Sequence, residues 1–453
     1  MFEIEKIYQI GFGAVAYGTL EIFNKEKLYM NCHFVIIDPK DKSDVLWKLF
    51  KEQGRSYEFI QEAMTSENME RLLKGCNSKT FILNLSVNVD SVEVLKIAKK
   101  KKSFYLDTSL ESYSDFQTPM NEITEYSQFQ KNNLYHQNFL AEKALKNTRK
   151  SRVLSMGFNP GMINNFAKKC LRLYAKTKNV DIDALQGDYG KAGHLLGLKS
   201  IIITEYDSQR LKIHSTKDRF VNTWSCIGLQ EEALDLVCVS LNPEDRNKLE
   251  KQGYKLIKPT EEGAENTNVR FIPVRGMDMS WKSYCLNDKG IPFSYTGLMI
   301  PHFETISMSS FFSYKNISPT IFYCYKVCEE AQMGLDFIRE NGYNILKDEL
   351  VVMNKDVKIS GRLDGFDSIG TLLTFENGIR VWGGSVLTSK KVKEMGFESN
   401  CTVIQVAASV SAAMKWELTY PNKGITQADE VNHEFLFKEA EKYLGKIFFK
   451  ILT

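Results

Sequence analysis

The sequence predicts an α/β protein in which a Rossmann domain, built on a doubly wound parallel sheet, precedes a second α+β domain with a mixed sheet. Three observations lead to this prediction. Strand-like and helix-like segments alternate over the first third of the chain. A glycine-rich turn joins the first of these strands to the first helix. Beyond Gly157 the segments become rich in Ile, Thr, Ser, Phe and Tyr, a composition that favours strands in a mixed or antiparallel sheet.

The N-terminal elements follow one another in the order that a parallel sheet requires. We expect strands at residues 6–10, 32–37, 80–85, 103–106 and 151–156, with helices at 14–24, 67–74, 92–100 and 138–146. Ligands of such sheets bind beyond the carboxyl ends of the strands. The residues that directly follow each strand are therefore the first candidates for a binding site.

The second part of the chain carries weaker local signals. We expect sheet in 197–206, 210–220 and 303–314, and helices in 321–334, 401–415 and 433–444, with Asn432 placed to cap the last helix. A chain of 453 residues is too long for one ordinary core. We therefore expect a nucleotide-binding domain at 1–157, a substrate-binding domain at 158–400, and C-terminal helices at 401–453 that pack back on the first domain.

The composition excludes several classes of function. A net charge of +3 lacks the excess of Lys and Arg that a nucleic-acid-binding protein concentrates on one face. No run approaches the roughly 20 apolar residues that span a bilayer, and no signal peptide precedes the first strand, so we expect no membrane contact. The nine cysteines are scattered and the six histidines form no pair at metal-ligand spacing. We therefore expect a cytoplasmic protein with reduced thiols and no metal site.

The turn after the first strand is a dinucleotide-binding fingerprint, Gly11-Phe-Gly13-Ala14-Val15-Ala16. Gly11 permits the tight turn, Gly13 leaves room for a pyrophosphate, and the small Ala16 permits close packing of helix on strand. The N–H groups at the start of the helix, around Ala14 and Val15, are donors for the phosphates. We expect Gly11, Gly13, Ala14 and Val15 to contact a cofactor directly.

Polar residues at the ends of two further strands extend this site. Asp38 ends the second strand, where its carboxylate can accept hydrogen bonds from the ribose hydroxyls. Because this charge would repel a 2′-phosphate, the sequence favours NAD over NADP. Asn84 and Ser86 follow another buried strand and suit contacts to the cofactor, although a capping role for the next helix explains them as well.

A series of short motifs runs along almost the whole chain in a fixed order. They are G-F-G at 11–13, N-L-S-V at 84–87, Y-L-D-T at 105–108, G-F-N-P-G-M at 157–162, T-E-Y-D-S-Q at 204–209, N-T-W-S at 222–225, I-P-H at 300–302, L-D-G-F-D-S-I-G at 363–370, T-V-I-Q-V-A-A at 402–408 and Y-L-G at 443–445. The set resembles the saccharopine dehydrogenase-like superfamily and, within it, the bacterial homospermidine synthases.

This resemblance implies a reaction without net redox change. NAD takes a hydride from putrescine, the resulting imine loses ammonia, a second putrescine condenses to a Schiff base, and the retained NADH reduces it to homospermidine. The resemblance also implies a homodimer, with the second domain contributing to dimerisation. It adds Asp107, Thr108 and Asn159 to the residues that would contact the cofactor.

Acidic residues in the motifs suit a dicationic substrate, because a cationic ligand makes buried carboxylates tolerable. By resemblance, Glu205 would hold the inner amine near the nicotinamide, while Glu111 and Glu232 would lie toward the entrance. Asp364 or Asp367 would help to bind substrate or move protons, and the sequence does not choose between them. An ordinary surface carboxylate is the alternative for each.

Three other residues complete the expected site. The resemblance places the indole of Trp224 in the pocket, where a cationic intermediate would gain ~1–2 kcal/mol from cation–π attraction. Asn159 would hydrogen-bond the nicotinamide amide or the substrate amine, and His302 would handle protons. The alternatives are a core tryptophan, a turn residue before Pro160, and a structural histidine.

Two rival functions follow from the same sequence. One is another activity of the superfamily, such as that of carboxynorspermidine dehydrogenase. Its substrate carries a carboxylate that calls for an Arg clamp, and the region around Trp224 is instead followed by acids. The other is a catalytically silent NAD-binding regulator, which would lack the acidic residues.

Overall fold

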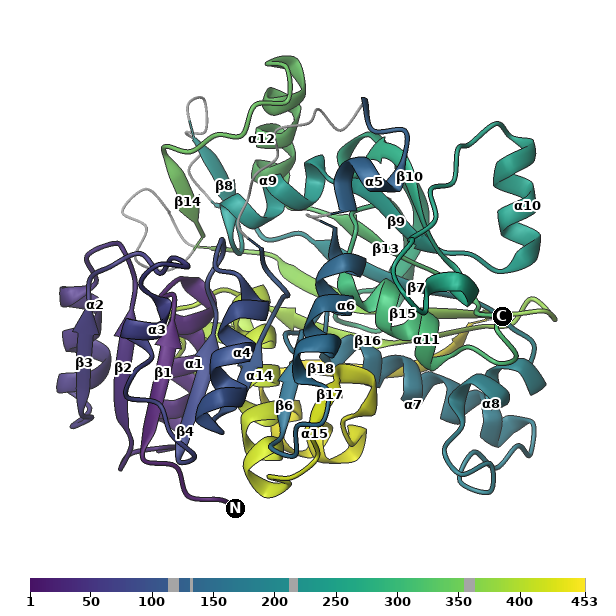
Figure 1. The fold of residues 1–453 in the computed structure, drawn as a ribbon. Helices are drawn as coiled ribbons and strands as arrows, with labels where there is room; N and C mark the ends of the chain where they lie inside the picture. Colours follow the sequence, from purple (N-terminus) through teal and green to yellow (C-terminus); the bar gives the residue numbers. More distant parts are fainter. Residues whose placement is uncertain (113–121, 131–132, 212–218, 354–362, 453) are drawn as a thin grey trace. The chain divides into compact units, whose positions relative to one another are not determined.

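The computed structural model describes residues 1–112, 122–130, 133–211, 219–353 and 363–452 (Figure 1). The chain divides into two compact units. Unit 1 consists of Met1–Asp115, His136–Met162 and Val403–Tyr443, and unit 2 of Phe116–Tyr135, Ile163–Thr402 and Leu444–Thr453. The largest differences from the expected bounds are that the segment ending at Tyr135 and the C-terminal segment from Leu444 belong to unit 2.

Unit 1 is built on a seven-stranded sheet whose pairings are all parallel. Its order is β17-β6-β5-β4-β1-β2-β3 (Figure 1). The strands are β1 (Lys6–Ile10), β2 (His33–Ile37), β3 (Tyr57–Ile60), β4 (Thr80–Asn84), β5 (Phe104–Asp107), β6 (Arg152–Leu154) and β17 (Ile425–Gln427). The first six follow the Rossmann order, which reverses between β1 and β4 and so creates a ligand crevice there. The predicted fold class is confirmed.

The helical segments of this part of the chain are mostly short. They are α1 (Ala14–Lys25), α2 (Ser43–Leu46), η1 (Trp47–Lys51), α3 (Met69–Leu72), α4 (Ser91–Lys101), α6 (Leu134–Leu145), α14 (Cys401–Thr419), η6 (Ala428–Glu430), α15 (His433–Ala440) and η7 (Glu441–Tyr443). Helix α15 begins as predicted, with the Asn432 side chain accepting from the N–H of Phe435. The helix expected at 67–74 shrinks to α3, and β3 was not predicted at all.

Unit 2 is built on a nine-stranded mixed sheet. Its path is β10-β9-β13-β7-β15-β16-β18, with β12 joining β13 and β11 joining β12. These strands are β7 (Leu198–Asp207), β9 (Leu236–Ser240), β10 (Val269–Arg275), β11 (Ser280–Leu286), β12 (Pro292–Leu298), β13 (Thr320–Lys326), β15 (Phe366–Phe375), β16 (Arg380–Thr388) and β18 (Lys446–Leu452). Strands β7 and β13 are parallel, whereas β15 is antiparallel to β7. The prediction of a mixed sheet is confirmed.

Shorter elements surround this sheet. A separate pair joins β8 (Phe220–Asn222) to β14 (Leu350–Val352). The helical segments are α5 (Tyr126–Phe129), α7 (Met162–Thr177), α8 (Tyr189–Leu195), α9 (Cys226–Leu234), α10 (Pro243–Lys251), η4 (Ala264–Asn266), η5 (Gly276–Asp278), α11 (Phe303–Phe311), α12 (Glu329–Glu340) and α13 (Ser389–Glu394). Of the strand expected at 210–220, residues 212–218 lie outside the described part of the chain, and Phe220 opens β8.

Two sequence-based assignments in unit 2 are wrong. Residues 303–314, expected to form sheet, begin with helix α11, which is buried along almost its whole length and packs on β9 and β13. Residues 321–334, expected to be helical, comprise most of β13 and the first half of α12. The hydrophobic periodicity of a short, fully buried apolar segment does not distinguish a strand from a helix. Tertiary packing therefore determines which of the two such a segment forms.

The core of unit 2 fixes β7 through one large side chain. Trp382 on β16 is fully buried, and its indole N–H donates to Thr204 Oγ1 at 3.0 Å. The ring occupies space that a side chain at position 370 would need, since a Cβ atom on Gly370 would lie 2.4 Å from Trp382 Cζ2. Strands β7, β15 and β16 are thus locked together beside residue 205.

The structure bears on the expected state of the cysteines and on the expected absence of a membrane-spanning helix. All nine cysteines fall within the described residues, and all are buried free thiols. Among the residues that the structure describes, no helix combines the length and the apolar character that crossing a membrane requires.

Candidate active site

The glycine-rich turn of unit 1 has the geometry that its sequence predicts. Gly11 has φ +80°, in the left-handed region, and a Cβ atom there would lie 2.7 Å from Ser86 Cα. Gly13 is the N-cap of α1 and is exposed, with no atom within 4 Å of the position of its missing Cβ. Because glycine has no side chain to cap the helix, the first-turn N–H groups at Ala14 and Val15 face a space that suits a pyrophosphate.

Asp38 ties this turn to the end of β2. Its Oδ2 accepts from the N–H of Phe12 at 2.7 Å, and its Oδ1 accepts from the N–H of Lys40 at 2.8 Å. Each carboxylate oxygen has a second lone pair, so these bonds leave acceptor capacity for ribose hydroxyls. The turn, the helix start and the acid together fit an adenine dinucleotide.

Asn84 and Asp107, both expected at the cofactor, belong to a buried hydrogen-bond chain. Asn84 Oδ1 accepts from Ser86 Oγ at 2.6 Å, and Asn84 Nδ2 lies 3.3 Å from Tyr105 Oη, to which it donates. The Tyr105 hydroxyl in turn donates to Asp107 Oδ2 at 2.7 Å. These contacts support a structural role for Asn84 and Asp107, whereas Ser86 and Thr108 are half-buried.

Asp107 connects the ends of β5 and β6. Its Oδ1 accepts from the N–H of Ser155 at 2.6 Å. Complete burial raises the pKa of the Asp107 carboxyl to about 7, although the bonds from Ser155 and Tyr105 favour the charged form. Asp107 therefore shapes the loop that leads into the next motif.

The G-F-N-P-G-M motif forms a closed loop at the start of α7. The N–H of Gly157 donates to the carbonyl of Pro160 at 2.8 Å, and the N–H of Met162 donates to the carbonyl of Gly157 at 3.1 Å. Gly161 has φ +129°, and a Cβ atom there would lie 2.2 Å from Gly157 O, so the loop requires glycine. Asn159, which precedes a cis peptide bond to Pro160, is half-buried within this loop.

Glu111 is the one expected substrate acid that belongs to unit 1. Its backbone N–H donates to Ser91 Oγ at 2.9 Å, and its carbonyl accepts from the N–H of Ser91 at 3.0 Å. These two bonds hold Glu111 beside the first turn of α4. Its side chain is half-buried.

In unit 2, Glu205 lies near the carboxyl end of β7 and is only 2% exposed. Its Oε2 accepts from the hydroxyl of Tyr323 at 2.6 Å. The neighbouring Tyr325 stacks on Tyr323, with ring centroids 5.4 Å apart, and its hydroxyl accepts from Trp224 Nε1 at 3.3 Å. Glu205 and Trp224 are thus connected through two tyrosines on one strand.

His302 connects three acidic or polar neighbours of this group. Its Nδ1 lies 2.7 Å from Glu304 Oε2 and its Nε2 lies 3.6 Å from Glu232 Oε2. Its ring also packs on Tyr323, with centroids 4.8 Å apart. Burial disfavours the charged imidazolium, but the charges of Glu304 and Glu232 outweigh it and hold the pKa of His302 well above its usual value.

This arrangement gives a prediction for pH dependence. A histidine whose pKa is raised on folding adds stability that is fully present below about pH 6.5 and is lost as pH rises through the folded pKa. The stability advantage of the wild type over His302→Gln, measured by urea unfolding, should therefore shrink as pH rises into the alkaline range. Titration of the six histidines by NMR gives the pKa directly. An ordinary value for the resonance missing in the variant would contradict the prediction.

The structure separates the two aspartates between which the sequence did not choose. Asp367 is buried on β15 and lies directly opposite Asp207 of β7, whereas Asp364 is exposed. Asp367 Oδ2 accepts from Thr402 Oγ1 at 2.9 Å, and Asp207 Oδ2 accepts from Thr223 Oγ1 at 2.6 Å. Asp367, unlike Asp364, therefore belongs to the acidic group around Glu205.

Burial raises the pKa of both aspartates, and the charges of neighbouring carboxylates raise it further. The pKa of Asp207 rises to about 6, chiefly through burial, and that of Asp367 rises well above its usual value through burial and the charges of Glu205 and Asp207. Carboxylates so placed make the interior of unit 2 strongly attractive to a cation. We refer to Glu205, Asp207, Glu232, Glu304 and Asp367 as the acidic cluster.

A matched pair of variants tests which aspartate acts. Asp367→Asn should lower kcat/KM for the cationic substrate by about 10-fold, because it removes a buried negative charge, while Asp364→Asn should leave it unchanged. Thermal unfolding should show no loss of stability in Asp367→Asn, since the change relieves repulsion. Equal effects of the two substitutions on kcat/KM would contradict the assignment.

Four residues of this site were missed by sequence reasoning. Tyr323 and Tyr325 lie in the segment assigned to a helix, and Glu304 lies in the segment assigned to sheet. Asp207 was present in the T-E-Y-D-S-Q motif, where residues two apart on a strand share one face. That spacing was the signal by which Asp207 could have been found.

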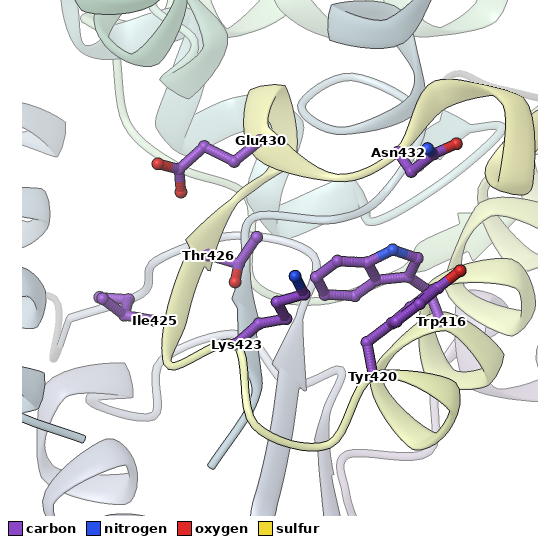
Figure 2. A pocket seen from close by; sticks show the side chains of 7 residues that line it. All are labelled: Trp416, Tyr420, Lys423, Ile425, Thr426, Glu430 and Asn432. Carbon is purple, nitrogen blue, oxygen red and sulfur yellow. The ribbon is translucent and has the colours of Figure 1, made fainter. Parts of the chain in front are cut away.

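Unit 1 also contains a separate pocket of about 340 Å³. Figure 2 shows its lining residues, which are Trp416, Tyr420, Lys423, Ile425, Thr426, Glu430 and Asn432. Asn432 is committed to capping α15, and Glu430 Oε2 accepts from the N–H of Gln427 at 2.9 Å. None of the residues predicted for the site lines this pocket.

The fold and the turn define unit 1 as a dinucleotide-binding domain, and comparison with known families specifies its type. Residues 7–151 match the family model described as the saccharopine dehydrogenase NADP binding domain. The superfamily resemblance stated from the motifs is therefore confirmed for this part of the chain.

Three known proteins are similar to this chain over nearly its whole length. The chain is 27% identical to the homospermidine synthase of Blastochloris viridis, covering 97% of this chain and 90% of that one. It is also 27% identical to the homospermidine synthase of Mesorhizobium japonicum, with 97% and 89% covered. The solved structure of the Legionella pneumophila homospermidine synthase in complex with NAD has the same fold, with a TM-score of 0.80, 22% identity, and coverage of 99% of this chain and 91% of that one. The chain is thus similar to homospermidine synthases over nearly its whole length, as its motifs predict.

Proposed function

We propose that this protein is a homospermidine synthase, which converts two molecules of putrescine into homospermidine and ammonia without net oxidation. The observation that carries this proposal is the acidic cluster of unit 2, assembled around His302 and connected to Trp224 in a chain that also has a dinucleotide-binding domain. Its similarity to homospermidine synthases over 97% of its length supports the same conclusion.

The acidic cluster favours a diamine over an anionic substrate. Buried carboxylates are costly unless a cation pairs with them, and putrescine offers an ammonium group at each end. The cluster has contacts to tyrosine, threonine and histidine side chains. A substrate that carries a carboxylate, as carboxynorspermidine dehydrogenase requires, would meet repulsion here.

The dinucleotide turn is proposed to hold NAD, with the pyrophosphate over Gly11 and Gly13 and the adenosine ribose at Asp38. The carboxylate of Asp38 opposes a 2′-phosphate, which favours NAD over NADP. When bound, NAD supplies a hydride acceptor for the first half of the reaction and returns the hydride in the second half. We propose further contacts from Ser86, Thr108 and Asn159.

The residues of unit 2 are proposed to bind the diamine and to handle its protons. Glu205 holds the amine that reacts, because it combines a buried negative charge with a fixed orientation. The amine of the second putrescine adds to the imine carbon and gives a geminal diamine, from which ammonia leaves once its nitrogen is protonated. The imidazolium of His302, kept charged by Glu304 and Glu232, can donate that proton. Burial of these groups keeps bulk water from hydrolysing the imine prematurely.

Trp224 is proposed to stabilise the cationic intermediates. The indole face attracts a cation, and an iminium ion spreads its charge over atoms that can lie against the ring. An attraction that is stronger for the intermediate than for the starting amine lowers the barrier instead of merely tightening binding. Glu111 and Glu232 are proposed to attract diamines toward the site.

The test is incubation of the purified protein with putrescine and a catalytic amount of NAD, with products identified by mass spectrometry. Homospermidine and ammonia should form without accumulation of NADH, and NADP should support less product. Stoichiometric NADH without a polyamine product would point to the dehydrogenase alternative. Absence of any reaction, with NAD bound, would point to a regulator.

We further expect a cytoplasmic homodimer, so light scattering should give twice the mass of one chain.

A further inference from the structure

Strand β13 carries two buried tyrosines, Tyr323 and Tyr325, to which neither the motifs nor the proposed function assigns a role. Residues two apart on a strand share one face, so Tyr323 and Tyr325 point to the same side of the sheet. Cys324 points to the other face, where its thiol lies 3.3 Å from the carbonyl oxygen of Trp281. Both tyrosines are almost completely buried. Strand β13 pairs in parallel with β7, and the register places Tyr325 beside Glu205.

Tyr323 contacts two groups that the proposed reaction uses. Its hydroxyl donates to Glu205 Oε2 at 2.6 Å, and its ring packs on the imidazole of His302. Burial and the charge of Glu205 raise the pKa of Tyr323 well above its usual value, so its hydroxyl stays a donor. A charge-assisted hydrogen bond from a buried donor helps to fix the orientation of a carboxylate.

Tyr325 holds the indole in a similar way. Its hydroxyl accepts from Trp224 Nε1 at 3.3 Å, which fixes the rotation of the ring. On the other side the ring lies against α9, where a Cβ atom on Gly228 would be 3.0 Å from Trp224 Cζ3. The stacking of Tyr325 on Tyr323 links the orientation of the indole to that of the carboxylate.

We infer that Tyr323 and Tyr325 are positioning residues of the diamine site: Tyr323 orients the Glu205 carboxylate toward the ammonium group, and Tyr325 orients the Trp224 indole toward the cationic intermediate. This inference rests on the proposed function and deepens it. The hydroxyl of Tyr323 thus supports binding of the diamine, and the hydroxyl of Tyr325 supports stabilisation of the cationic intermediate.

Single-hydroxyl deletions separate the two roles. Tyr323→Phe should raise KM for putrescine about 10-fold and shift the acidic limb of the kcat/KM profile to higher pH, because Glu205 loses a hydrogen bond to its charged form. Tyr325→Phe should lower kcat about 5-fold with little change in KM. In a Trp224→Phe background the further effect of Tyr325→Phe should vanish, since there is no indole N–H left to orient.

Tyr295→Phe is the matched control. Tyr295 is a buried tyrosine of β12 whose hydroxyl donates to the carbonyl of Cys324 at 2.8 Å, so its loss costs a comparable buried hydrogen bond. It should lower the unfolding temperature and leave KM, kcat and the pH profile unchanged. If Tyr323→Phe and Tyr325→Phe behave like this control, their role is structural and the inference is overturned.

Calorimetric titration of putrescine into the NAD-bound protein separates this inference from the proposed function. Wild type that binds putrescine but makes no homospermidine would overturn the synthase assignment, and weaker binding by Tyr323→Phe would still support the positioning role. Equal binding by wild type and Tyr323→Phe would overturn the role of Tyr323. Wild type that neither binds nor converts putrescine would overturn both.

Discussion

Glu205→Gln should lower kcat/KM for putrescine by about 100-fold or more, since removing one partner of a buried, hydrogen-bonded charge pair costs roughly 2–5 kcal/mol. The amide keeps the shape of the side chain but loses the charge that faces the ammonium group. Steady-state kinetics with putrescine at saturating NAD measure the effect. Retention of more than a tenth of the wild-type kcat/KM would contradict the role given to Glu205.

Stability should move in the opposite direction for the same variant. The charge of Glu205 raises the pKa of Asp367. A neutral residue at position 205 therefore removes the repulsion between these two carboxylates in the substrate-free protein. The unfolding temperature of Glu205→Gln should therefore equal or exceed that of the wild type. Glu244→Gln serves as the control, because Glu244 forms an exposed ion pair with Lys199 and should affect neither property.

Trp224→Ala should lower kcat by about 30-fold, which corresponds to ~2 kcal/mol of cation–π stabilisation in a desolvated site. NAD binding, followed by calorimetry, should stay close to that of the wild type, because the proposed dinucleotide contacts come from unit 1. Trp224→Phe should retain part of the activity, since a phenyl face attracts cations more weakly than an indole. A collapse of NAD affinity would contradict the cation–π role.

Trp281→Ala is the control for this prediction. Trp281 lies on β11, is 45% exposed, and packs edge to face on Phe322. Its loss removes a comparable indole outside the acidic cluster. If Trp281→Ala lowered kcat as much as Trp224→Ala, the effect would have to be ascribed to general destabilisation.

The nucleotide-binding half of the fold could be predicted because its signals are local. A strand, a glycine turn, a helix and an acid after the next strand all fall within the first 38 residues, and β1, α1 and β2 occur where expected. The π-helical turn η1 and strand β3 escaped prediction, since residues 40–66 have no clear period. Helix α3 is shorter than predicted and spans only Met69–Leu72.

The second half could not be predicted as well, because two of its elements, β13 and α11, are buried along almost their whole length. The sequence T-I-F-Y-C-Y-K of β13 and the sequence F-E-T-I-S-M-S-S-F of α11 are both apolar and β-prone, and only their packing partners separate them. The sequence therefore indicated a mixed sheet correctly but exchanged a strand and a helix within it.

The residues of the candidate site likewise fall into those that could be predicted from the sequence and those that could not. Glu205, Trp224 and His302 were named from motifs, and the structure brings them together. Tyr323 and Glu304 were not, because their contacts depend on the pairing of β13 with β7 and on the start of α11, which no local pattern encodes. The choice of Asp367 over Asp364 likewise required the register that sets Asp367 against Asp207.

The edge strand β17 has a consequence for how the chain acquires its fold during synthesis. It completes the sheet of unit 1 by pairing Ile425 with Arg152, and the hydroxyl of Ser151 accepts from the N–H of Lys423 at 2.9 Å. The chain must therefore have emerged from the ribosome beyond residue 427 before β17 can reach its place beside β6. Until then β6 presents an unpaired edge, a feature that invites self-association. A nascent chain halted before Ile425 should accordingly depend on chaperones more than the finished protein does.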